Sequence, residues 1–243
     1  MIEGDSVATG GRRKRSLDAG TGLTRDQIVQ TALRMADAEG DPNKFTMRSL
    51  AAELDVGVMT LYTYFRTKDA ILDGMAAKVL GEMTIPSGAD DPATAIRLVA
   101  QSMLDVMREH PSVGRLLAAR LTDNEDALYG SLEVPLRRLV DAGIPGPLAA
   151  RCYGFIMVLA IGFSSYHLAR PWGYSDTGED SAEMRRQREH YYAGRPLAQF
   201  PTVVELAADI VDIPGDATYK FGIEALVDAV RREIEVTASS TVE

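Results

Sequence analysis

The amino-acid sequence predicts an all-α protein with two parts, a small N-terminal domain over residues 23–84 and a larger C-terminal domain over residues 85–243. Apolar residues recur at spacings of three and four along most of the chain, which is the spacing of one helix face. Helix caps and helix-ending residues stand between these segments, and Ile85-Pro86-Ser87-Gly88 separates the two domains. Residues 1–22 lack a periodic apolar pattern and are rich in Gly, Ser, Thr and charge, so we expect a disordered arm.

The first predicted helix begins at Thr24 and ends at Gly40. Thr24 and Gln27 have the spacing of a capping box, in which two side chains satisfy free N–H groups of the first turn. Gly40 favours the left-handed conformation that ends many helices. The apolar residues of this helix form one stripe that we expect to pack behind the next two helices: Ile28, Val29, Ala32, Leu33, Met35 and Ala36.

Residues 45–65 predict two short helices joined by a tight turn. Thr46 is the expected N-cap of the first helix, and Gly57, a residue that sharp turns tolerate, opens the second helix. The inward faces consist of Met47, Leu50, Ala51 and Leu54 in the first helix and of Val58, Leu61 and Phe65 in the second. This arrangement predicts a helix-turn-helix.

The other face of the second helix carries uncharged side chains that are short or hydrogen-bonding, namely Met59, Thr60, Tyr62, Thr63 and Tyr64. Cations stand at both ends, with Arg48 before the turn and Lys68 after the second helix. A helix of this make-up enters the DNA major groove in helix-turn-helix proteins, while flanking side chains hold phosphates. Because Lys68 lies beyond the helix, we expect it to contact phosphate. We expect Tyr62 to contact phosphate as well. Thr60 and Thr63 are expected nearer to the base edges.

This stretch resembles the DNA-binding domain of the tetracycline-repressor (TetR) family of bacterial regulators. In that family a T-x-R-x-L-A-x-x-L-x-V segment precedes an x-x-x-T-L-Y-x-[HY]-[FV] helix, then x-x-K and a long fourth helix. The matching positions are Thr46, Arg48, Leu50, Ala51, Leu54, Val56, Thr60, Leu61, Tyr62, Tyr64, Phe65 and Lys68. Gly57 departs from the family, which often has Ser there, although Gly still serves as an N-cap. The residues of this domain expected to bind DNA are Thr46, Arg48, Val58, Met59, Thr60, Tyr62, Thr63, Tyr64 and Lys68.

The net charge of −9 ordinarily counts against nucleic-acid binding, but the charge is unevenly distributed. Residues 1–83 hold 11 Lys and Arg against 12 Asp and Glu, whereas residues 84–243 hold 15 against 23. The acidic excess therefore belongs mostly to the C-terminal domain. The basic groups at the helix-turn-helix stay available to phosphates.

The N-terminal arm carries four consecutive cations, Arg12, Arg13, Lys14 and Arg15. One interpretation is a solvated basic tail without a role of its own. The other is an arm that touches DNA, because basic arms just before such domains enter the minor groove in other helix-turn-helix proteins. We favour the second interpretation.

A fourth helix, capped by Thr67 and running to about Met83, is expected to connect the two domains. The helices predicted beyond it cover residues 91–110, a short segment at 113–117, and residues 124–142, 147–169, 201–213 and 216–236. Pro135 predicts a kink or break in the helix over 124–142. Residues 170–195 are expected to form a mobile loop, with partial helix over 184–192 as the alternative.

The helices over 147–169 and 216–236 are so apolar that one small helical domain would not bury them completely. A twofold partner covers such surfaces, so we expect a homodimer through these two helices. The resemblance implies the same, because the family dimerises through two C-terminal helices of each subunit in a four-helix bundle. Residues 221–226, FGIEAL, resemble the F-x-[FW]-G-L-[ED]-x-[IL] closing segment of its tetracycline-repressor-like branch.

The sequence predicts neither an enzyme nor a binder of a cofactor or metal. Gly162-Phe163-Ser164-Ser165-Tyr166 comes nearest to a nucleophile elbow, but it lacks the closing Gly and lies in a predicted helix. His110, His167 and His190 lack the spacing of metal ligands and are expected at the surface or as caps. No Gly-rich phosphate loop is present in the sequence.

The sequence predicts a cytoplasmic protein that does not enter a membrane. The single cysteine, Cys152, permits no intramolecular disulfide, which suits a reducing compartment. The N-terminus is polar where a secretory signal needs an apolar run. The longest apolar run, Cys152 to Phe163, is too short to span a bilayer and predicts a buried helix.

Methionine and aromatic residues recur in the predicted C-terminal helices, and by default they belong to the core. The resemblance implies an alternative for the group, because the family binds its effectors among helices 5 to 8. Flexible Met side chains and Tyr hydroxyls suit a bulky, partly aromatic ligand. The expected ligand-binding residues are Met103, Met107, Tyr153, Phe155, Met157, Phe163 and Trp172.

Taken with the resemblance, the sequence predicts a homodimeric repressor that binds a palindromic operator in double-stranded DNA. A small hydrophobic or aromatic effector is expected to release it from the operator. The alternative is a DNA-binding regulator without an effector, in which the C-terminal domain serves only dimerisation.

Overall fold

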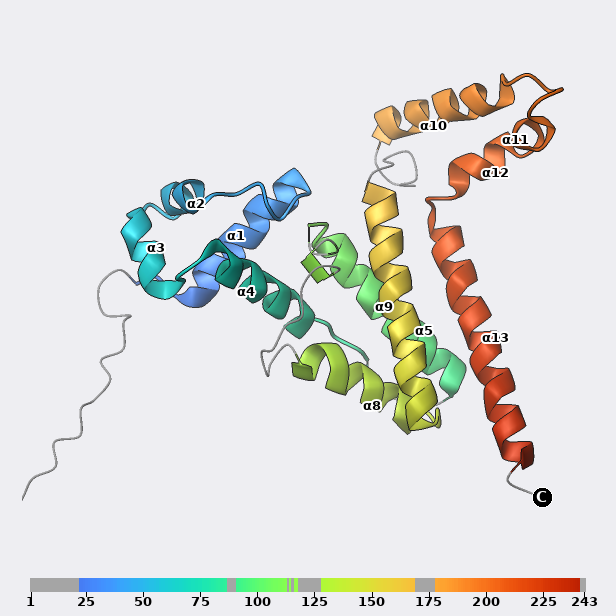
Figure 1. Ribbon diagram of the computed structural model, residues 1–243, viewed down its shortest axis with the longest axis horizontal. Coiled ribbons are helices and arrows are strands. Elements are labelled where there is room, and N and C mark those ends of the chain that lie inside the picture. Colours follow the sequence, from blue (N-terminus) through green and yellow to red (C-terminus); the bar gives the residue numbers. More distant parts are fainter. Residues whose placement is uncertain are drawn as a thin grey trace, which may run out of the picture.

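The computed structural model describes residues 22–86, 91–112, 114, 116–117, 128–168 and 178–240, and the elements within these ranges are all helices (Figure 1). They are α1 (Arg25–Glu39), α2 (Met47–Glu53), α3 (Val58–Tyr64), α4 (Lys68–Gly81), α5 (Pro92–Glu109), the π-helical segment η1 (Tyr129–Glu133), α8 (Val134–Asp141), α9 (Gly146–Leu168), α10 (Gly178–Ala193), α11 (Pro201–Glu205), α12 (Ala207–Asp212) and α13 (Asp216–Ser240). The all-α prediction is therefore confirmed.

The caps predicted for the first helices are present. Thr24 and Gln27 form the capping box of α1, with the Gln27 N–H donating to Thr24 Oγ1 at 3.1 Å. Gly40 ends α1 in the left-handed conformation, at φ 60°. Thr46 caps α2, and Thr67 caps α4 by accepting from the Ala70 N–H at 3.1 Å. Local side-chain chemistry therefore determines where these helices begin.

Helices α1 to α4 form a compact unit at one end of the molecule (Figure 1). α1 packs along α4, and α2 packs against α3 across the turn. The side chains at the centre of this unit are fully buried: Ile28, Leu50, Leu61, Ile71 and Met75. The long α4 then carries the chain from this unit toward the C-terminal body, where its last turn meets η1.

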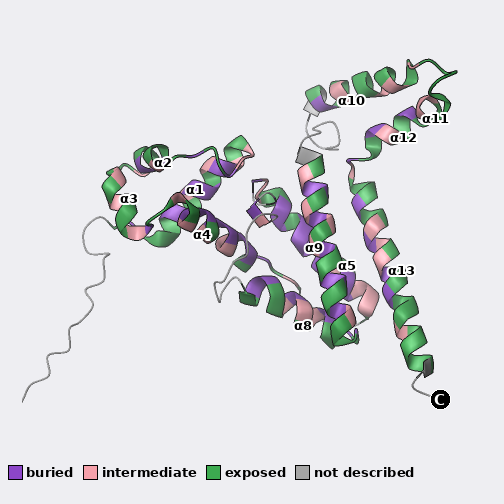
Figure 2. Cartoon of the chain, viewed as in Figure 1, coloured by how far each residue is buried: buried purple, intermediate pink, exposed green. Residues whose placement is uncertain are grey.

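The C-terminal body is built around α9, which packs against α5, α8 and α13 (Figure 1). Asp91 caps α5 with Pro92 in its first turn, and α5 ends before His110, as predicted. α10 to α12 pack against one another beyond the ends of α9 and α13, where much of their surface is exposed (Figure 2).

α9 is long and apolar enough to cross a membrane by length and composition alone, over Gly146–Tyr166. The expectation of a run too short to span a bilayer is therefore wrong, because the apolar helix extends beyond Cys152 and Phe163 at both ends. Core helices of globular proteins pass the same test, and α9 packs against α5, α8 and α13.

Two predicted segments differ from the structure. Residues 178–193 form α10 and not a loop, although the alternative of a helix over 184–192 is correct. α10 is highly charged, and pairs such as Arg186 with Glu183, at 2.8 Å, stabilise a helix without an apolar stripe. The helix predicted over 201–213 is divided at Leu206 into α11 and α12.

Candidate functional site

The helix-turn-helix exposes one face of α3 and buries the other. Leu61, on the inner face of α3, is fully buried. Met59 is 76% exposed, and Tyr62 and Thr63 are exposed as well. Thr60 and Val58 are half-buried at the edges of this face. The predicted base-reading and phosphate-binding side chains of α3 thus lie on one accessible surface, which is the geometry that a groove-reading helix needs.

Tyr64 lies away from this exposed face and ties α3 to the start of the domain. Its hydroxyl donates to the Leu23 carbonyl at 2.9 Å. Arg25 donates to the Tyr64 carbonyl, and its guanidinium stands 4.6 Å from the centre of the Phe65 ring. The contacts of Tyr64 are therefore intramolecular, and its place at the end of α3 did not reveal this. The sequence pattern does not indicate these contacts of Arg25, because they join residues about 40 positions apart.

Thr46 and Lys68, two other predicted DNA contacts, also have intramolecular partners. Thr46 Oγ1 accepts from the Ser49 N–H at 3.0 Å as the cap of α2. Lys68 Nζ donates to the Asn43 carbonyl at 2.7 Å and stands 4.7 Å from the centre of the Phe45 ring. Arg48, by contrast, is exposed on α2. The cations Arg12 to Arg15 of the arm lie outside the described residues.

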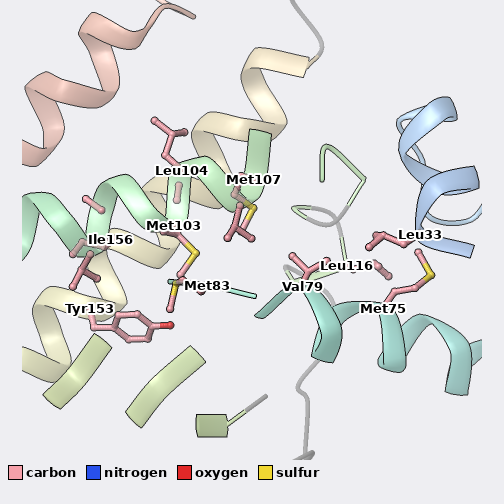
Figure 3. Close-up of a cluster of buried hydrophobic side chains, with 14 of the residues drawn as sticks. Leu33, Met75, Val79, Met83, Met103, Leu104, Met107, Leu116, Tyr153 and Ile156 are labelled. Atoms are coloured by element: carbon pink, nitrogen blue, oxygen red, sulfur yellow. The ribbon is translucent and has the colours of Figure 1, made fainter. Parts of the chain in front are cut away.

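The structure buries four of the predicted ligand-binding residues in its hydrophobic core. Met103 and Met107 of α5 and Tyr153 of α9 belong to the buried hydrophobic core (Figure 3), and Phe163 of α9 belongs to the same core cluster. Burial raises the pKa of the Tyr153 hydroxyl, which therefore stays protonated and donates to the Ser131 carbonyl in η1.

Phe163 and the remaining members of the predicted ligand set differ in their exposure. Phe155 does not join the buried cluster, because it is 45% exposed on the outer face of α9. It stands two residues after Tyr153, or about 200° around a helix with 3.6 residues per turn. Phe163 is buried against the Tyr219 ring of α13, with ring centres 5.2 Å apart, and Met157 is half-buried. Trp172 lies outside the described residues.

An open apolar groove of about 410 Å³ runs between α9 and the start of α13. Its lining residues are Phe155, Val158, Leu159, Gly162, Phe163, Tyr166, Ile213 and Thr218. α13 approaches α9 closely here, since a Cβ on Gly222 would lie 2.9 Å from Leu159 Cδ2. Exposed apolar residues of α9, one of the two helices predicted to dimerise, thus line this groove beside the start of α13, and Phe221 of α13 has a ring that is 77% exposed.

Polar contacts join the N-terminal unit to the body at the end of α5. His110, the C-cap of α5, places Nδ1 2.9 Å from Asp37 Oδ2 of α1 and Nε2 3.2 Å from Glu82 Oε2 at the end of α4. Ser112 donates to Asp37 Oδ1 from both its N–H and its hydroxyl. Among the described residues, no group of three or more His, Cys, Asp or Glu is arranged to hold a metal ion.

Comparison with known proteins places this geometry in a family. Residues 28–75 match the model for "Bacterial regulatory proteins, tetR family". The repressor DrrR1 of Streptomyces coeruleorubidus is 27% identical over 211 residues, covering 86% of this chain and 77% of its own. A helix-turn-helix transcriptional regulator of Saccharopolyspora erythraea is 30% identical over 182 residues, covering 70% of this chain and 72% of its own.

Solved structures agree with these matches. The Streptomyces coelicolor TetR family protein ActR, in complex with actinorhodin, superposes with a TM-score of 0.71 at 26% identity. The match covers 86% of this chain and 95% of ActR. It therefore extends over the helix-turn-helix and the C-terminal helices alike. This chain belongs to the TetR family of bacterial transcriptional regulators.

Proposed function

We propose that this protein represses transcription by binding a palindromic operator as a homodimer, and that a small hydrophobic or aromatic ligand releases it. The exposed face of α3, with Met59, Tyr62 and Thr63 outward over a buried Leu61, is the observation that carries the proposal. DrrR1 is named a repressor, and ActR binds actinorhodin, which supports both halves of the proposal. Such a protein acts on the chromosome, so we place it in the cytoplasm.

Selection from random double-stranded DNA tests the first half of this proposal. The selected duplexes are expected to share an inverted repeat whose half-sites are about one helical turn, or 34 to 36 Å, apart. A reporter gene placed behind that repeat should be silenced by the protein. Recovery of no common sequence, or activation of the reporter, contradicts the proposal.

Thermal unfolding with a panel of aromatic compounds, including actinorhodin, tests the second half. A ligand that binds only the folded protein raises its unfolding temperature by mass action. The same compound must also weaken operator binding, because a ligand shifts an equilibrium only through its different affinity for the two states. If no compound does both, the alternative of an effector-independent regulator is favoured.

Lys68→Ala is expected to weaken binding to all DNA sequences about equally and to lower the slope of log affinity against log salt by about 1 for each subunit, or about 2 for the dimer. Lys68 stands at the start of α4, beyond the reading face of α3, where backbone phosphate is within reach. The measurement is operator titration at several salt concentrations, with Lys68→Arg as the charge-preserving control. A fall in thermal stability with an unchanged salt slope would reduce Lys68 to its contacts with Asn43 and Phe45.

Removal of residues 1–21 is expected to weaken operator binding most at low salt. The arm joins the domain at Leu23, whose carbonyl receives the Tyr64 hydroxyl at the end of α3, so its root lies next to the reading helix. Even half of the four cations per subunit would add roughly 3 to 4 units to the salt slope of a dimer. Equal slopes for truncated and full-length protein would make Arg12 to Arg15 a solvated tail.

A further inference from the structure

A second groove, of about 430 Å³, lies between α5 and α13, on residues that the proposed operator and effector sites do not use. Its base is apolar and almost completely buried, with Ala100 and Leu104 from α5 and Tyr219 and Ile223 from α13. The Tyr219 hydroxyl donates to the Ala100 carbonyl at 2.8 Å, and burial raises its pKa, so the phenol stays neutral. The base of this α5–α13 groove therefore suits an apolar ligand body.

An ion pair between α5 and α13 stands toward each end of the α5–α13 groove. Arg97 donates from Nε and Nη2 to the Glu224 carboxylate at 2.8 and 2.6 Å, and Arg108 Nη2 donates to Asp216 Oδ1 at 2.5 Å. The later residue of α5 thus pairs with the earlier residue of α13, so the two helices run antiparallel. Arg97 and Arg108 are separated by about 16 Å along a helix that rises 1.5 Å per residue. The groove is therefore elongated, with polar ends and an apolar middle.

Lys220 is a third cation in the lining and lies midway between the two acids on α13. Asp216 precedes it by four residues and Glu224 follows it by four, spacings at which oppositely charged side chains pair on a helix. Arginines of α5 hold both carboxylates instead, and among the described residues Lys220 forms no ion pair. The hydrogen bond from Arg97, with a smaller contribution from the charge of Lys220, holds the pKa of Glu224 below its usual range. Lys220 is therefore a nearby cation that the groove leaves without a counter-ion of its own.

The charge of the lining differs in sign from that of the domain around it. Three cations stand against two acids in the groove, a net charge of +1, whereas residues 84–243 hold 15 Lys and Arg against 23 Asp and Glu. A locally positive groove in an acidic domain favours an anionic ligand over a cationic one.

We propose that the α5–α13 groove binds a small amphipathic carboxylate. Its acid group pairs with Lys220, and its aliphatic chain lies along Leu104 and Ile223. The path between two packed antiparallel helices suits a chain, and the mainly aliphatic base supplies the apolar contacts that ligand sites need. Such a ligand contacts both helices and so strengthens the packing of α13 against α5.

Titration calorimetry of the full-length protein with decanoate and 1-decanol tests the ligand class. The two probes share the same chain and differ only in the head group. Decanoate is expected to bind about 10-fold more tightly, because hydrogen bonds between charged groups are stronger than neutral ones. These measurements need no DNA, so their outcome is independent of the proposed repressor function. Equal affinities for the two probes, or no binding of decanoate, would overturn the proposal.

Lys220→Met tests the cation, since it keeps an unbranched apolar side chain and removes the charge. Decanoate affinity should fall about 10-fold, to that of 1-decanol, while 1-decanol affinity stays the same. Arg232→Met is the matched control, because Arg232 is an exposed cation of the same helix outside the groove, and its decanoate affinity should equal that of the wild type. Equal losses in the two variants would reduce the effect to net charge and overturn the site.

Ala217→Trp tests the place of the chain. Ala217 is exposed and lines the groove, so a large side chain there obstructs the groove without entering the core. Both probes should bind at least about 10-fold more weakly, since most of a ligand's surface is buried in such a site. Thermal unfolding should stay cooperative, and sedimentation equilibrium should give the wild-type oligomeric state. Unchanged probe affinity would put the chain elsewhere, and a changed oligomeric state would assign the groove to a second copy of the protein; either result overturns the proposal.

Discussion

Replacing Val158 by aspartate is expected to separate the proposed homodimer and to weaken operator binding by about 100-fold or more. Val158 is 75% exposed and lines the apolar groove between α9 and the start of α13. A carboxylate buried there without a partner costs about 3 kcal/mol or more, which is a factor above 100 in the dimer dissociation constant. A single subunit reads only one half-site of a palindrome, so the loss of the dimer is also a loss of operator affinity.

Sedimentation equilibrium and operator titration measure the two effects of Val158→Asp together. Val140→Asp is the matched control, because Val140 is 46% exposed on α8, outside the groove between α9 and α13. The control should remain dimeric and keep its operator affinity. If Val158→Asp also remains a dimer, the subunits meet through another face.

The N-terminal elements could be predicted from sequence because their signals are local. The Thr24 capping box and the left-handed Gly40 act within one turn of the helix they begin or end. The helix-turn-helix adds a dozen positions at fixed spacing, and the structure places its two helices where the apolar pattern required them.

Contacts between distant positions could not be predicted in this way. Tyr64 donates to Leu23, 41 positions earlier, and Lys68 donates to Asn43, 25 positions earlier. No periodic pattern relates such pairs. The sequence therefore predicts only DNA contacts for Tyr64 and Lys68, and not their contacts within the protein. Phe155 was assigned to the ligand set for a related reason, since α9 is apolar nearly all round and its pattern does not distinguish the inner from the outer face.

The sequence predicts that Pro135 disturbs its helix, but it does not predict the form of the disturbance. Proline in a helix predicts a kink or a break, and the chain instead widens into η1 just before α8. The Tyr153 hydroxyl of α9 donates to the Ser131 carbonyl in η1, and Gly130 of η1 lies close to the backbone of α4. Both contacts join η1 to other helices. Sequence therefore located the irregularity, whereas the tertiary packing determined its form.

Asp37 holds the junction between the DNA-binding unit and the C-terminal body. Its Oδ1 accepts from the Ser112 N–H at 3.0 Å and from the Ser112 hydroxyl at 2.6 Å, and its Oδ2 faces His110 Nδ1 at 2.9 Å. The Asp37 side chain is only 17% exposed, so water replaces these partners poorly after a substitution. The three contacts connect α1 to the segment that follows α5.

Asp37→Ala is therefore expected to lower the free energy of unfolding by about 3 kcal/mol or more, since each hydrogen bond to a charged group contributes about 1.5 to 3 kcal/mol. Asp37→Asn keeps one oxygen for Ser112 but removes the charge facing His110, so its loss should be intermediate. Glu39→Ala, two residues later and exposed on the same helix, is the control and should change the stability by no more than about 0.5 kcal/mol. Urea unfolding followed by circular dichroism measures all three variants. Equal stability of Asp37→Ala and Glu39→Ala would show that these contacts do not hold the two parts of the molecule together.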